Sequence, residues 1–560
     1  MTKMIDIKEK INQISFETTT SNTNRPDIRV AAILDPFSYE CFRYECTLSQ
    51  ISEQNWMQEI NSINPDFLFV ESVWEAWDFS TVVEDDDHEL RKLISYCNRC
   101  NIKTVFWNKE DSINYNNFIG IAKLFDLVFT SDINCIDQYK IDLGHDNIFP
   151  LPFAAQPRIH NPIDSFKFKK MDTAFAGAWY NLNVFNERQK DMWFLLNGAV
   201  EFNLNIFDRK FHSTSVNFQF PDKFKPYIVG NLNYQDMIKA YKLYKVFLNV
   251  NSIKNSSTMF SRRVFELLAS GTNVVSAYSK GISEMFDGIV SLVSTESETK
   301  KELSLLYSDE EYRRRKSVLG IREIHKKHLY QHRFEYILEK LNIRATRNCE
   351  IGVSIICIPN INNIKNVIKN YDSQKILYKE LLLVIVGDKN NMYEMIGERE
   401  DIKFIYASCV KTVYLDALNE AKYEYVSFFN GNDYYASNYL LDLIDTFNYS
   451  KSPLTGKMSY FSYDQECDEL VLNNTGEEYK YVNAISIDSL IARKQCFKKV
   501  ITGESDLFTL DNNDTILSIT NVPNLYSSDR YNYIKVKLIN NCGNGFLCEV
   551  PDKFISKVTI

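Results

Sequence analysis

From residue 28 onward the chain alternates short apolar runs with amphipathic stretches, and this alternation constrains its fold more than any other feature. "IRVAAILDP" and "NPDFLFVES" have the length and the apolar content of buried strands, while "ELRKLISYCNRC" has the apolar spacing of a helix. Strands that alternate with helices predict a parallel, doubly wound sheet. Such sheets bind ligands beyond the carboxyl ends of their strands, so the residues that follow each strand are the first candidates for a site.

Polar side chains stand at the ends of the first predicted strands. Asp35 ends the first strand and Glu71 the second, while residues 108–111 end the third and residues 131–132 the fourth. Because the carboxyl ends of parallel strands meet at one edge of a sheet, we expect these side chains to lie near one another.

Two interruptions of the alternation divide the chain. "AAQPRIHNPIDSFKFKKM" has prolines in or beside it and no periodicity, which indicates a connection, and "NIRATRNCE" marks a second break. A long charged helix over residues 308–341 is expected to close the middle part. The expected parts are an N-terminal helix and linker (1–26), two α/β domains of similar size (27–160 and 161–342) and a third α/β domain (350–560).

Charge and apolar pattern exclude several classes of protein. The net charge of -9 argues against a chain-wide role in nucleic-acid binding. No run of about 18 apolar residues occurs, so no membrane span is expected, and the start of the chain lacks the apolar core of a signal peptide. The 12 cysteines are scattered, as in reduced cytoplasmic proteins, so the expected location is the cytoplasm. The glycine motifs of dinucleotide and P-loop sites do not occur.

Residues 28–341 carry a set of motifs in a recognisable order. The motifs are "TVFWNKED", "FDLVFTSD", "LPFAAQP", "FAGAWY", "YKVFLNVNS", "TMFSRRVFELLASG" and "HLYQHR". With these motifs the segment resembles the CgeB/YkvP-type glycosyltransferases, a GT-B group related to the large family with the E-x7-E signature. The resemblance implies two Rossmann-like domains with a cleft between them and a nucleotide-sugar donor.

Residues 351–445 contain a second set of motifs. They are "VSIICIPNINNIKNVIKNYDSQ", "LLLVIVGD", "LNEAKYEYVSFFNGNDYY" and "SNYLLDLI". With these segments the region is similar to the start of a family-2 glycosyltransferase of GT-A fold. The resemblance implies a second donor site, with a divalent metal held by a D-x-D motif at a strand end.

The segment around Glu266 allows two interpretations. In the first, the apolar residues form a core stripe, Glu266 is solvated and Gly271 ends the helix. In the second, Arg262, Arg263 and Glu266 surround a sugar nucleotide at a helix N-terminus. The resemblance supports the second interpretation, because Glu266 matches the family glutamate that holds the ribose.

The chain departs from the family pattern at one position. Thr258 stands where the first Glu of E-x7-E is expected, so neither that donor-sugar contact nor a retaining mechanism is carried over. Without a metal, arginines have to stabilise the leaving diphosphate, and Arg262 and Arg263 are the candidates. Adjacent helical positions diverge by about 100°, so the helix pattern alone does not place both in the cleft.

Further donor-binding candidates follow from the same resemblance. Gly177 lies at a turn after a strand and allows close approach of the backbone to a ligand. Arg188 matches a position where related enzymes carry a phosphate-binding base, and a surface salt bridge is the alternative. Asn251 alternates with Asn249 on one face of a strand and is a candidate for the same pocket.

The acceptor is expected on the first α/β domain. If the reaction inverts the anomeric centre, a general base must deprotonate the acceptor hydroxyl. Glu110 and Asp111 are candidates, with Asp35 behind them. The alternative for these residues is helix N-capping.

The third domain has an altered metal motif. Residues 430–433 match the D-x-D segment, but Asn432 is an amide, and Asp433 is the remaining carboxylate and a weak metal candidate. Asp388 matches the family position that contacts the base or ribose. The alternative for Asp433 is a turn residue that caps the next helix.

Three hypotheses follow. In the first, the GT-B unit moves a sugar from a nucleotide sugar, with a UDP-sugar expected, to a cell-surface, spore, flagellar or other glycan or protein acceptor, without a cofactor. In the second, the GT-A-like domain also catalyses a transfer, with Mg²⁺ or Mn²⁺. In the third, the chain is a non-catalytic scaffold that binds sugar nucleotides or glycans. The acceptor and association into a homo-oligomer stay open.

Overall fold

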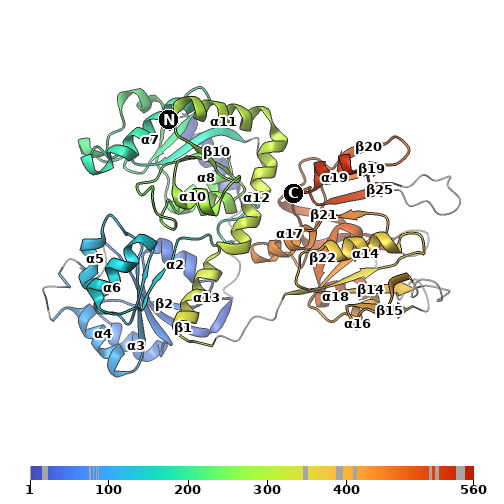
Figure 1. The fold of residues 1–560 in the computed structure, drawn as a ribbon, viewed down its shortest axis with the longest axis horizontal. Helices are drawn as coiled ribbons and strands as arrows, with labels where there is room; N and C mark the ends of the chain where they lie inside the picture. Colours follow the sequence, from blue (N-terminus) through green and yellow to red (C-terminus); the bar gives the residue numbers. More distant parts are fainter. Residues whose placement is uncertain are drawn as a thin grey trace. The chain divides into compact units, whose positions relative to one another are not determined.

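The structure is a computed structural model, and its chain forms two compact units, Met1–Thr346 and Arg347–Ile560 (Figure 1). This division falls inside the segment 342–350, where the sequence predicts a break. The described residues are 2–14, 23–74, 77, 79, 81–82, 85, 87–168, 170–344, 351–385, 395–407, 413–503, 507–510, 516–537 and 549–560.

The first lobe of the first unit is a parallel sheet with strand order β2-β1-β3-β4-β5-β6. Its strands are β1 (Arg25–Ile33), β2 (Cys46–Gln50), β3 (Phe67–Glu71), β4 (Lys103–Asn108), β5 (Leu127–Thr130) and β6 (Ile148–Pro150). Its helices include α2 (Pro36–Phe42), α3 (Trp56–Ile63), α4 (Glu89–Arg99), α5 (Tyr115–Ala122) and α6 (Ile136–Leu143).

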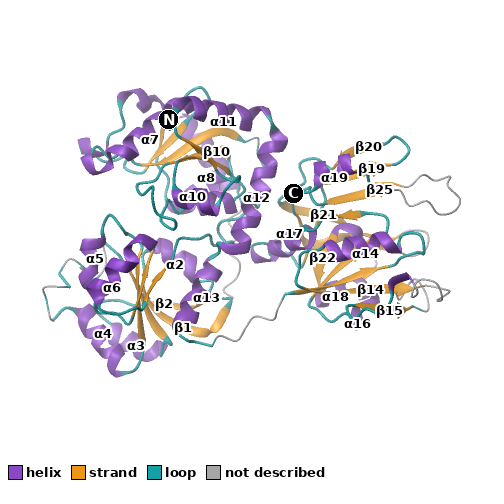
Figure 2. Ribbon diagram, in the orientation of Figure 1, coloured by secondary structure: helices purple, strands orange, loops and turns teal. Residues whose placement is uncertain are grey.

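Both faces of this sheet are covered, and the sequence of β3 shows why. Phe67 and Phe69 point to one core cluster, whereas Leu68 and Val70 point to the other, because side chains alternate along a strand. A strand that is apolar at every position therefore needs helices on both of its faces, as Figure 2 shows for this lobe.

The second lobe repeats the design with strand order β12-β11-β10-β7-β8-β9, again with parallel neighbours. The predicted alternation of strands and helices is therefore confirmed in both lobes. The strands are β7 (Met171–Gly177), β8 (Asn205–Asp208), β9 (Ile228–Gly230), β10 (Tyr244–Asn249), β11 (Asn273–Ala277) and β12 (Ser291–Val293). The helices include α7 (Asn186–Ala199), α8 (Tyr234–Tyr241), α9 (Arg263–Ala269), α10 (Lys280–Met285), α11 (Glu296–Ser308) and α12 (Glu310–Lys327).

The single long helix expected over residues 308–341 is wrong, because the chain breaks it after α12. The backbone N–H of Ala155 donates to the carbonyl of His328 at 2.9 Å, and that of Tyr330 donates to the carbonyl of Ala155 at 3.0 Å. These bonds divert backbone groups that a continuous helix would need. The chain then continues as α13 (Tyr330–Lys340).

The two ends of the first unit each pack on the lobe that lies farther away in sequence. Helix α1 (Thr2–Gln13) contacts α8 and β9 of the second lobe. Helix α13 contacts the first lobe, where the rings of Phe334 and Phe67 lie 6.4 Å apart and Glu335 forms an ion pair with Arg25 at 3.0 Å. The chain therefore ties the lobes together at both of its ends.

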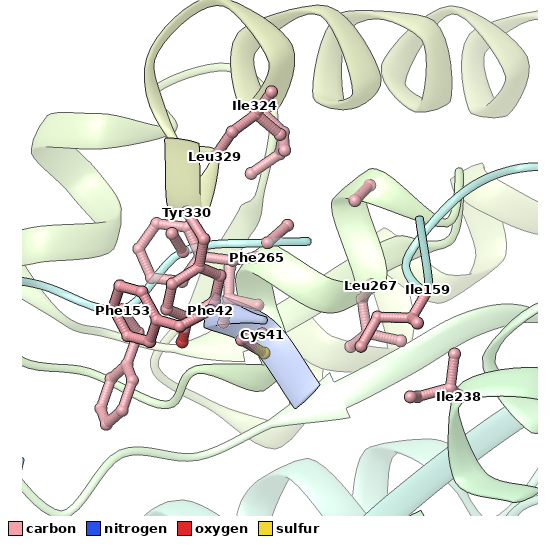
Figure 3. Close-up of a cluster of buried hydrophobic side chains, with 14 of the residues drawn as sticks. Cys41, Phe42, Phe153, Ile159, Ile238, Phe265, Leu267, Ile324, Leu329 and Tyr330 are labelled. Carbon is pink, nitrogen blue, oxygen red and sulfur yellow. The ribbon is translucent and has the colours of Figure 1, made fainter. Parts of the chain in front are cut away.

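A shared apolar core joins the two lobes (Figure 3). Phe42 of α2 packs edge-on against Tyr330 of α13 with ring centroids 4.9 Å apart, and Phe265 of α9 belongs to the same buried cluster. Each such ring stabilises the fold by about 1.5–3 kcal/mol through its burial. This core fixes the edge along which the lobes face each other.

The second unit is also α/β, but its main sheet is mixed. The order is β15-β14-β13-β16-β22-β18-β24-β21, with β23 beside β24, and a second sheet has the order β17-β25-β19-β20. The stretch from β15 to β16 is parallel, and β22 is antiparallel to β16.

The strands of the second unit are β13 (Gly352–Cys357), β14 (Tyr378–Ile385), β15 (Ile402–Tyr406), β16 (Tyr425–Phe429), β17 (Tyr434–Tyr435), β18 (Leu454–Gly456), β19 (Tyr460–Asp464), β20 (Glu469–Asn473), β21 (Lys480–Ser486), β22 (Leu490–Arg493), β23 (Phe508–Leu510), β24 (Ile516–Ser527) and β25 (Tyr533–Lys537). Its helices include α14 (Ile364–Ser373), α16 (Val413–Glu420), α17 (Tyr439–Asp445), α18 (Lys494–Thr502) and α19 (Asp552–Val558). Among the described residues of both units, no helix has the length and apolar content needed to cross a membrane.

Candidate functional site in the cleft of the first unit

A cavity of about 450 Å³ lies between the two lobes, at the carboxyl ends of their strands. The first lobe contributes the segment after β4, which includes Lys109, Glu110 and Asp111. The second lobe contributes the end of β7 and the segment between β10 and α9. A cavity of this size is typical of sites for small molecules, and its position is the one expected for parallel sheets.

The second-lobe wall of this cavity is positively charged. Among the described residues that line it are Arg188, Arg209, Arg262 and Arg263, and this wall has no carboxylate. The carboxylates of the lining, Glu110 and Asp111, come from the first lobe. The second-lobe wall is therefore suited to an anion, and guanidinium groups fit phosphate oxygens in a bidentate manner.

Arg262 and Arg263 both line the cavity, although the helix pattern alone does not require it. Arg263 is the first residue of α9 and Arg262 is its N-cap residue. The guanidinium of Arg262 lies 3.5 Å from the ring centre of Phe37, while Nε of Arg263 is buried without a hydrogen-bond partner in the described part of the chain. An unsatisfied buried N–H is costly, so a ligand that accepts from it would be favoured.

Glu266 is not where its predicted role places it. The carboxylate is 1% exposed, accepts from the hydroxyl of Tyr241 at 2.8 Å and from that of Tyr234 at 3.3 Å, and does not line the cavity. Its Oε1 lies 3.4 Å from Nη1 of Arg262. In this arrangement the carboxylate of Glu266 faces Arg262 and the hydroxyls of Tyr234 and Tyr241.

The charge of Glu266 follows from its neighbours. Burial alone raises the pKa of the carboxyl, but Arg262 and then His160 lower it, and the net pKa is below its ordinary value. Glu266 is therefore ionised at neutral pH and serves as the counter-ion of Arg262, whose pKa is raised in turn. The solvated-glutamate interpretation is excluded as well.

Arg188 does not form the surface salt bridge that is the alternative to a binding role. It is 9% exposed, and its Nη1 donates to the carbonyl of Ala178 at 3.1 Å. Its guanidinium lies 5.0 Å from the ring centre of Tyr180. Burial lowers its pKa to about 10. A buried guanidinium at the cavity wall without a carboxylate partner among the described residues is a suitable anion contact.

Gly177 and Asn251 also line the cavity. A Cβ on Gly177 would lie 2.9 Å from the ring of Phe175, so a side chain at this end of the strand would clash with that ring. The Oδ1 of Asn251 accepts from the backbone N–H of Ser261 at 3.0 Å. Asn251 therefore anchors the segment that carries Arg262 into the cavity wall.

Asp111 and Glu110 differ in their burial and in the number of hydrogen bonds that their carboxylate oxygens accept. Asp111 is fully buried and accepts from Thr130 at 2.6 Å, from Asn108 at 2.7 Å and from Tyr139 at 3.0 Å, and burial raises its pKa to about 7. Glu110 is half-buried and accepts from Asn114 at 3.3 Å. The carboxylate of Glu110 is thus the more available of the two.

Asp35 belongs to an ion cluster at the strand ends instead of the cavity lining. It caps α2 by accepting from the N–H of Ser38 at 2.8 Å, so the capping alternative holds for this residue, and it forms an ion pair with Lys109. Glu71 also accepts from Lys109, at 3.1 Å. Burial raises the pKa of Glu71 to about 7, whereas Lys109 outweighs the burial of Asp35 and lowers its pKa.

Lys109 and Thr258 make contacts at the cleft that the sequence pattern does not reveal. Lys109 joins two strand-end carboxylates and still lines the cavity. The hydroxyl of Thr258 donates to the carbonyl of Ser131 at 2.8 Å and accepts from the N–H of Ile133 at 2.9 Å. The residue that replaces the expected Glu thus bridges the two lobes. In the sequence, Lys109 is marked only by its place beside a predicted strand end, and Thr258 only by its place at the first position of the E-x7-E register.

In the corresponding segment of the second unit, residues 430–433, the carboxyl group is buried. Asp433 is 1% exposed, and its oxygens accept from the hydroxyl of Tyr533 at 2.7 Å and from the N–H of Val536 at 2.9 Å. Asn432 accepts from Asn363 at 3.2 Å. Both oxygens of Asp433 therefore already accept a hydrogen bond inside the second unit.

Two further facts bear on the metal interpretation of this segment. The described residues contain no group of three or more His, Cys, Asp or Glu side chains placed to hold a metal ion. Asp388 lies outside the described residues. Burial and, after it, Asp488 raise the pKa of Asp433 to about 8, which favours a protonated carboxyl inside the protein.

Comparisons with known proteins bear on the second lobe. Residues 188–339 match a family model described as glycosyl transferase-like, and the search of curated proteins found no relative. Similar solved structures include a glycosyltransferase from Rickettsia africae ESF-5 (11% identity, 56% of this chain, 89% of that chain, TM-score 0.36) and sucrose-phosphate synthase from Thermosynechococcus elongatus (9%, 52%, 76%, 0.35). The family match begins at Arg188 and includes Arg262, Arg263 and Glu266, so it covers most of the basic wall of the cavity.

Proposed function

We propose that the chain is a glycosyltransferase of GT-B type whose first unit binds a nucleotide-sugar donor, with a UDP-sugar as the expected donor, and transfers the sugar to a glycan or protein acceptor. One observation carries this proposal. The arginine-lined wall of the cleft cavity falls within the residues that match the glycosyl transferase-like model.

The donor diphosphate is assigned to Arg188, Arg262 and Arg263. A charge-assisted hydrogen bond contributes about 1.5–3 kcal/mol, and leaving-group charge grows as the glycosidic bond breaks. Guanidinium groups that are fixed before the reaction stabilise this charge at no cost of reorganisation. Arg262 is fixed by Glu266 and by the ring of Phe37, and Arg188 by the carbonyl of Ala178.

Glu266 then acts as a positioning residue. Its carboxylate is committed to Arg262, Tyr234 and Tyr241, so it sets the guanidinium in place instead of accepting from the ribose hydroxyls. This proposal replaces the ribose contact that the family resemblance implies. Asn251 keeps its place as a donor-side residue because it lines the cavity and holds the loop.

On the acceptor side, Glu110 is the proposed general base of an inverting transfer. It lines the cavity, is half-buried and keeps part of its carboxylate available. Asp111 and Asp35 are assigned to support: Asp111 ties the strand end to Thr130 and Tyr139, and Asp35 orients Lys109.

The second unit is proposed as a family-2-like module of GT-A type without transfer activity of its own. The supporting observation is the internal use of Asp433, together with amides at the D-x-D positions. The function proposed for this unit is to bind the acceptor glycan in the cytoplasm. The glycan would belong to a spore, flagellar or cell-envelope polymer.

The experiment is a transfer and hydrolysis assay of the full chain with a panel of UDP-, GDP- and TDP-sugars. We expect one donor class to be turned over, and we expect Glu110→Gln to lower kcat while donor affinity stays within about twofold. Glu40→Gln, in which a half-exposed carboxylate that pairs with Arg43 is changed, is the control and should behave as wild type. Binding of no donor by calorimetry would contradict the proposal and leave the scaffold hypothesis in its glycan-binding form.

A further inference from the structure

A second cavity, of about 430 Å³, lies at the opposite edge of the second-lobe sheet. Lys170 directly precedes β7, Lys245 is the second residue of β10 and Asn273 is the first residue of β11, and all three line it. Strands rise about 3.3 Å per residue, so the length of β7 separates this cavity from the donor cavity by about 20 Å. The proposed function does not use it.

Positive charge gathers in this second cavity. Lys170, Lys245, Arg313 and Arg314 line it, against the single carboxylate of Glu310 among the described lining residues. Two of these four cations form ion pairs with carboxylates of the described residues, and two do not. Arg314 pairs with Glu310 at 2.7 Å, and Lys245 pairs with Asp172 at 2.7 Å.

The two remaining cations lie side by side. In the described part of the chain, neither Lys170 nor Arg313 forms an ion pair with a carboxylate, and Nη1 of Arg313 donates to the carbonyl of Leu306 at 2.7 Å. Burial, with Arg313 and Arg314 nearby, lowers the pKa of Lys170 to about 7. The protein therefore keeps like charges together in a partly buried hollow, where an anion would relieve them.

Rings and a fixed floor give the hollow its shape. Phe166, Phe168 and Tyr307 line it. The floor is closed where Ser317 donates to the carbonyl of Gly271 at 2.7 Å. Gly271 has a φ of +71°, and a Cβ there would lie 3.1 Å from the Ser317 hydroxyl, so a side chain at this position would strain the backbone and crowd the floor.

We propose that this second cavity binds a small phosphate ester, with the phosphate between Lys170 and Arg313 and its sugar or nucleoside ring against the aromatic lining. A phosphate dianion matches two adjacent cations, and a guanidinium can meet two of its oxygens at once. A volume of about 430 Å³ suits a small molecule better than a polymer.

The second cavity is also joined to the donor cavity by one short element. Helix α9 begins at Arg263, which lines the donor cavity, and Gly271, two residues beyond its end at Ala269, lines the second cavity. The helix rises about 1.5 Å per residue, so α9 itself spans about 9 Å from Arg263 to Ala269. The affinity for the donor is therefore the quantity to measure when a ligand fills the second cavity.

The test is calorimetry of the full chain with glucose 1-phosphate and with UMP. We expect a site that Lys170→Met weakens at least tenfold and that Lys170→Arg retains. Lys225→Met, at an exposed lysine that pairs with Asp222, is the matched control and should bind as wild type. Arg263→Ala should leave this site in place while it weakens the donor site.

Two results would overturn the proposal. The first is wild-type affinity for both esters in Lys170→Met. The second is the loss of all binding in Arg263→Ala, which would assign the esters to the donor cavity alone. Lys170→Met removes a cation that has no ion-pair partner among the described residues, so the Tm of this variant should not fall. A thermal scan of the variant therefore checks for a folding defect.

A third titration separates the sources of the phosphate. Inorganic phosphate should bind at least fivefold more weakly than the better of the two esters, because it lacks the ring that contacts Phe166 and Tyr307. Equal affinity for inorganic phosphate would overturn the ring contact. The donor-sugar assay is independent of these titrations, so the failure of either proposal leaves the other open to its own test.

Discussion

The strand end at residues 108–111 and the strand end at residues 430–433 look alike in sequence but differ in structure. Each carries Asn and Asp after a buried strand, and each is a predicted site. The first lines a cavity with Lys109 and Glu110, opposite a wall of arginines. In the second, the carboxylate of Asp433 is used up by β25 of its own unit.

The difference shows what a polar strand end needs in order to become a site. In the first unit a second lobe brings complementary charge from residues 188–263 and leaves a space between the walls. In the second unit a neighbouring strand takes that place and satisfies the carboxyl internally. Polar residues at a strand end are therefore necessary for the predicted chemistry, but the opposing wall decides whether it occurs.

The largest expected effect is the loss of stability in Glu266→Ala. Removal of the buried carboxylate leaves Arg262, whose side chain is 33% exposed, without its counter-ion and two tyrosine hydroxyls without their acceptor, which costs about 2–3 kcal/mol in the free energy of unfolding. Urea unfolding of the full chain, with hydrogen exchange in residues 263–269 as a local readout, measures it. Glu284→Ala, at a carboxylate that is 51% exposed and lies near Lys280, should cost less than about 1 kcal/mol. Equal costs in the two variants would refute the counter-ion role.

Arg263→Ala is expected to weaken binding of UDP by about 10–100-fold, because one charge-assisted contact of about 1.5–3 kcal/mol is lost. Stability should change little, since Nε of Arg263 is buried without a hydrogen-bond partner among the described residues. Calorimetry gives the affinity and a thermal scan gives the Tm. Arg315→Ala, on α12 and paired with Glu311, is the control. Unchanged affinity in Arg263→Ala would remove this residue from the donor site.

Asp433→Asn should match the wild type in stability below about pH 4, where the carboxyl is protonated in both the folded and the unfolded state, and should be the more stable of the two at pH 7, where only the unfolded carboxyl is ionised. A raised pKa means that the folded state binds the proton more tightly than the unfolded state. The wild type therefore loses stability as pH rises from about 4 through 8, whereas the variant does not. Unfolding at pH 6 and pH 9 measures the difference, and a variant that is relatively less stable at pH 9 would contradict this assignment.

The smallest effect concerns metal removal. EDTA should leave the UDP affinity of the full chain within about twofold, because guanidinium groups take the role of a cation in the cleft. A loss of more than tenfold, restored by Mg²⁺ or Mn²⁺, would favour the bifunctional hypothesis and reopen the second unit as a donor site.

Local periodicity was sufficient to predict the parallel sheets, because a buried strand and an amphipathic helix are each encoded by neighbouring residues. It also placed Glu110 and Asp111 at a strand end that lines the cavity, whereas Arg188, Arg262 and Arg263 are donor-site candidates through the family resemblance. The lining of the cavity by both adjacent arginines depends on the segment before α9, which Asn251 anchors.

The fate of Glu266 and of Asp433 could not be predicted in this way. The partners of Glu266 are Tyr234 and Tyr241 of α8, and those of Asp433 lie on β25, about a hundred residues away. Spacing shows which face of an element a residue occupies, but it does not show which distant side chain meets it there. The return of α13 to the first lobe has the same cause.

The most direct test of the account is hydrogen exchange of the full chain with and without saturating UDP. Loops exchange quickly unless a ligand orders them, so binding in the cleft should slow exchange in residues 178–186 and 250–262. Residues 430–438 of the second unit should exchange at the same rate in both conditions. Protection of residues 430–438 alone, or UDP binding without any protection in the cleft segments, would contradict the assignment of the donor to the arginine-lined cavity.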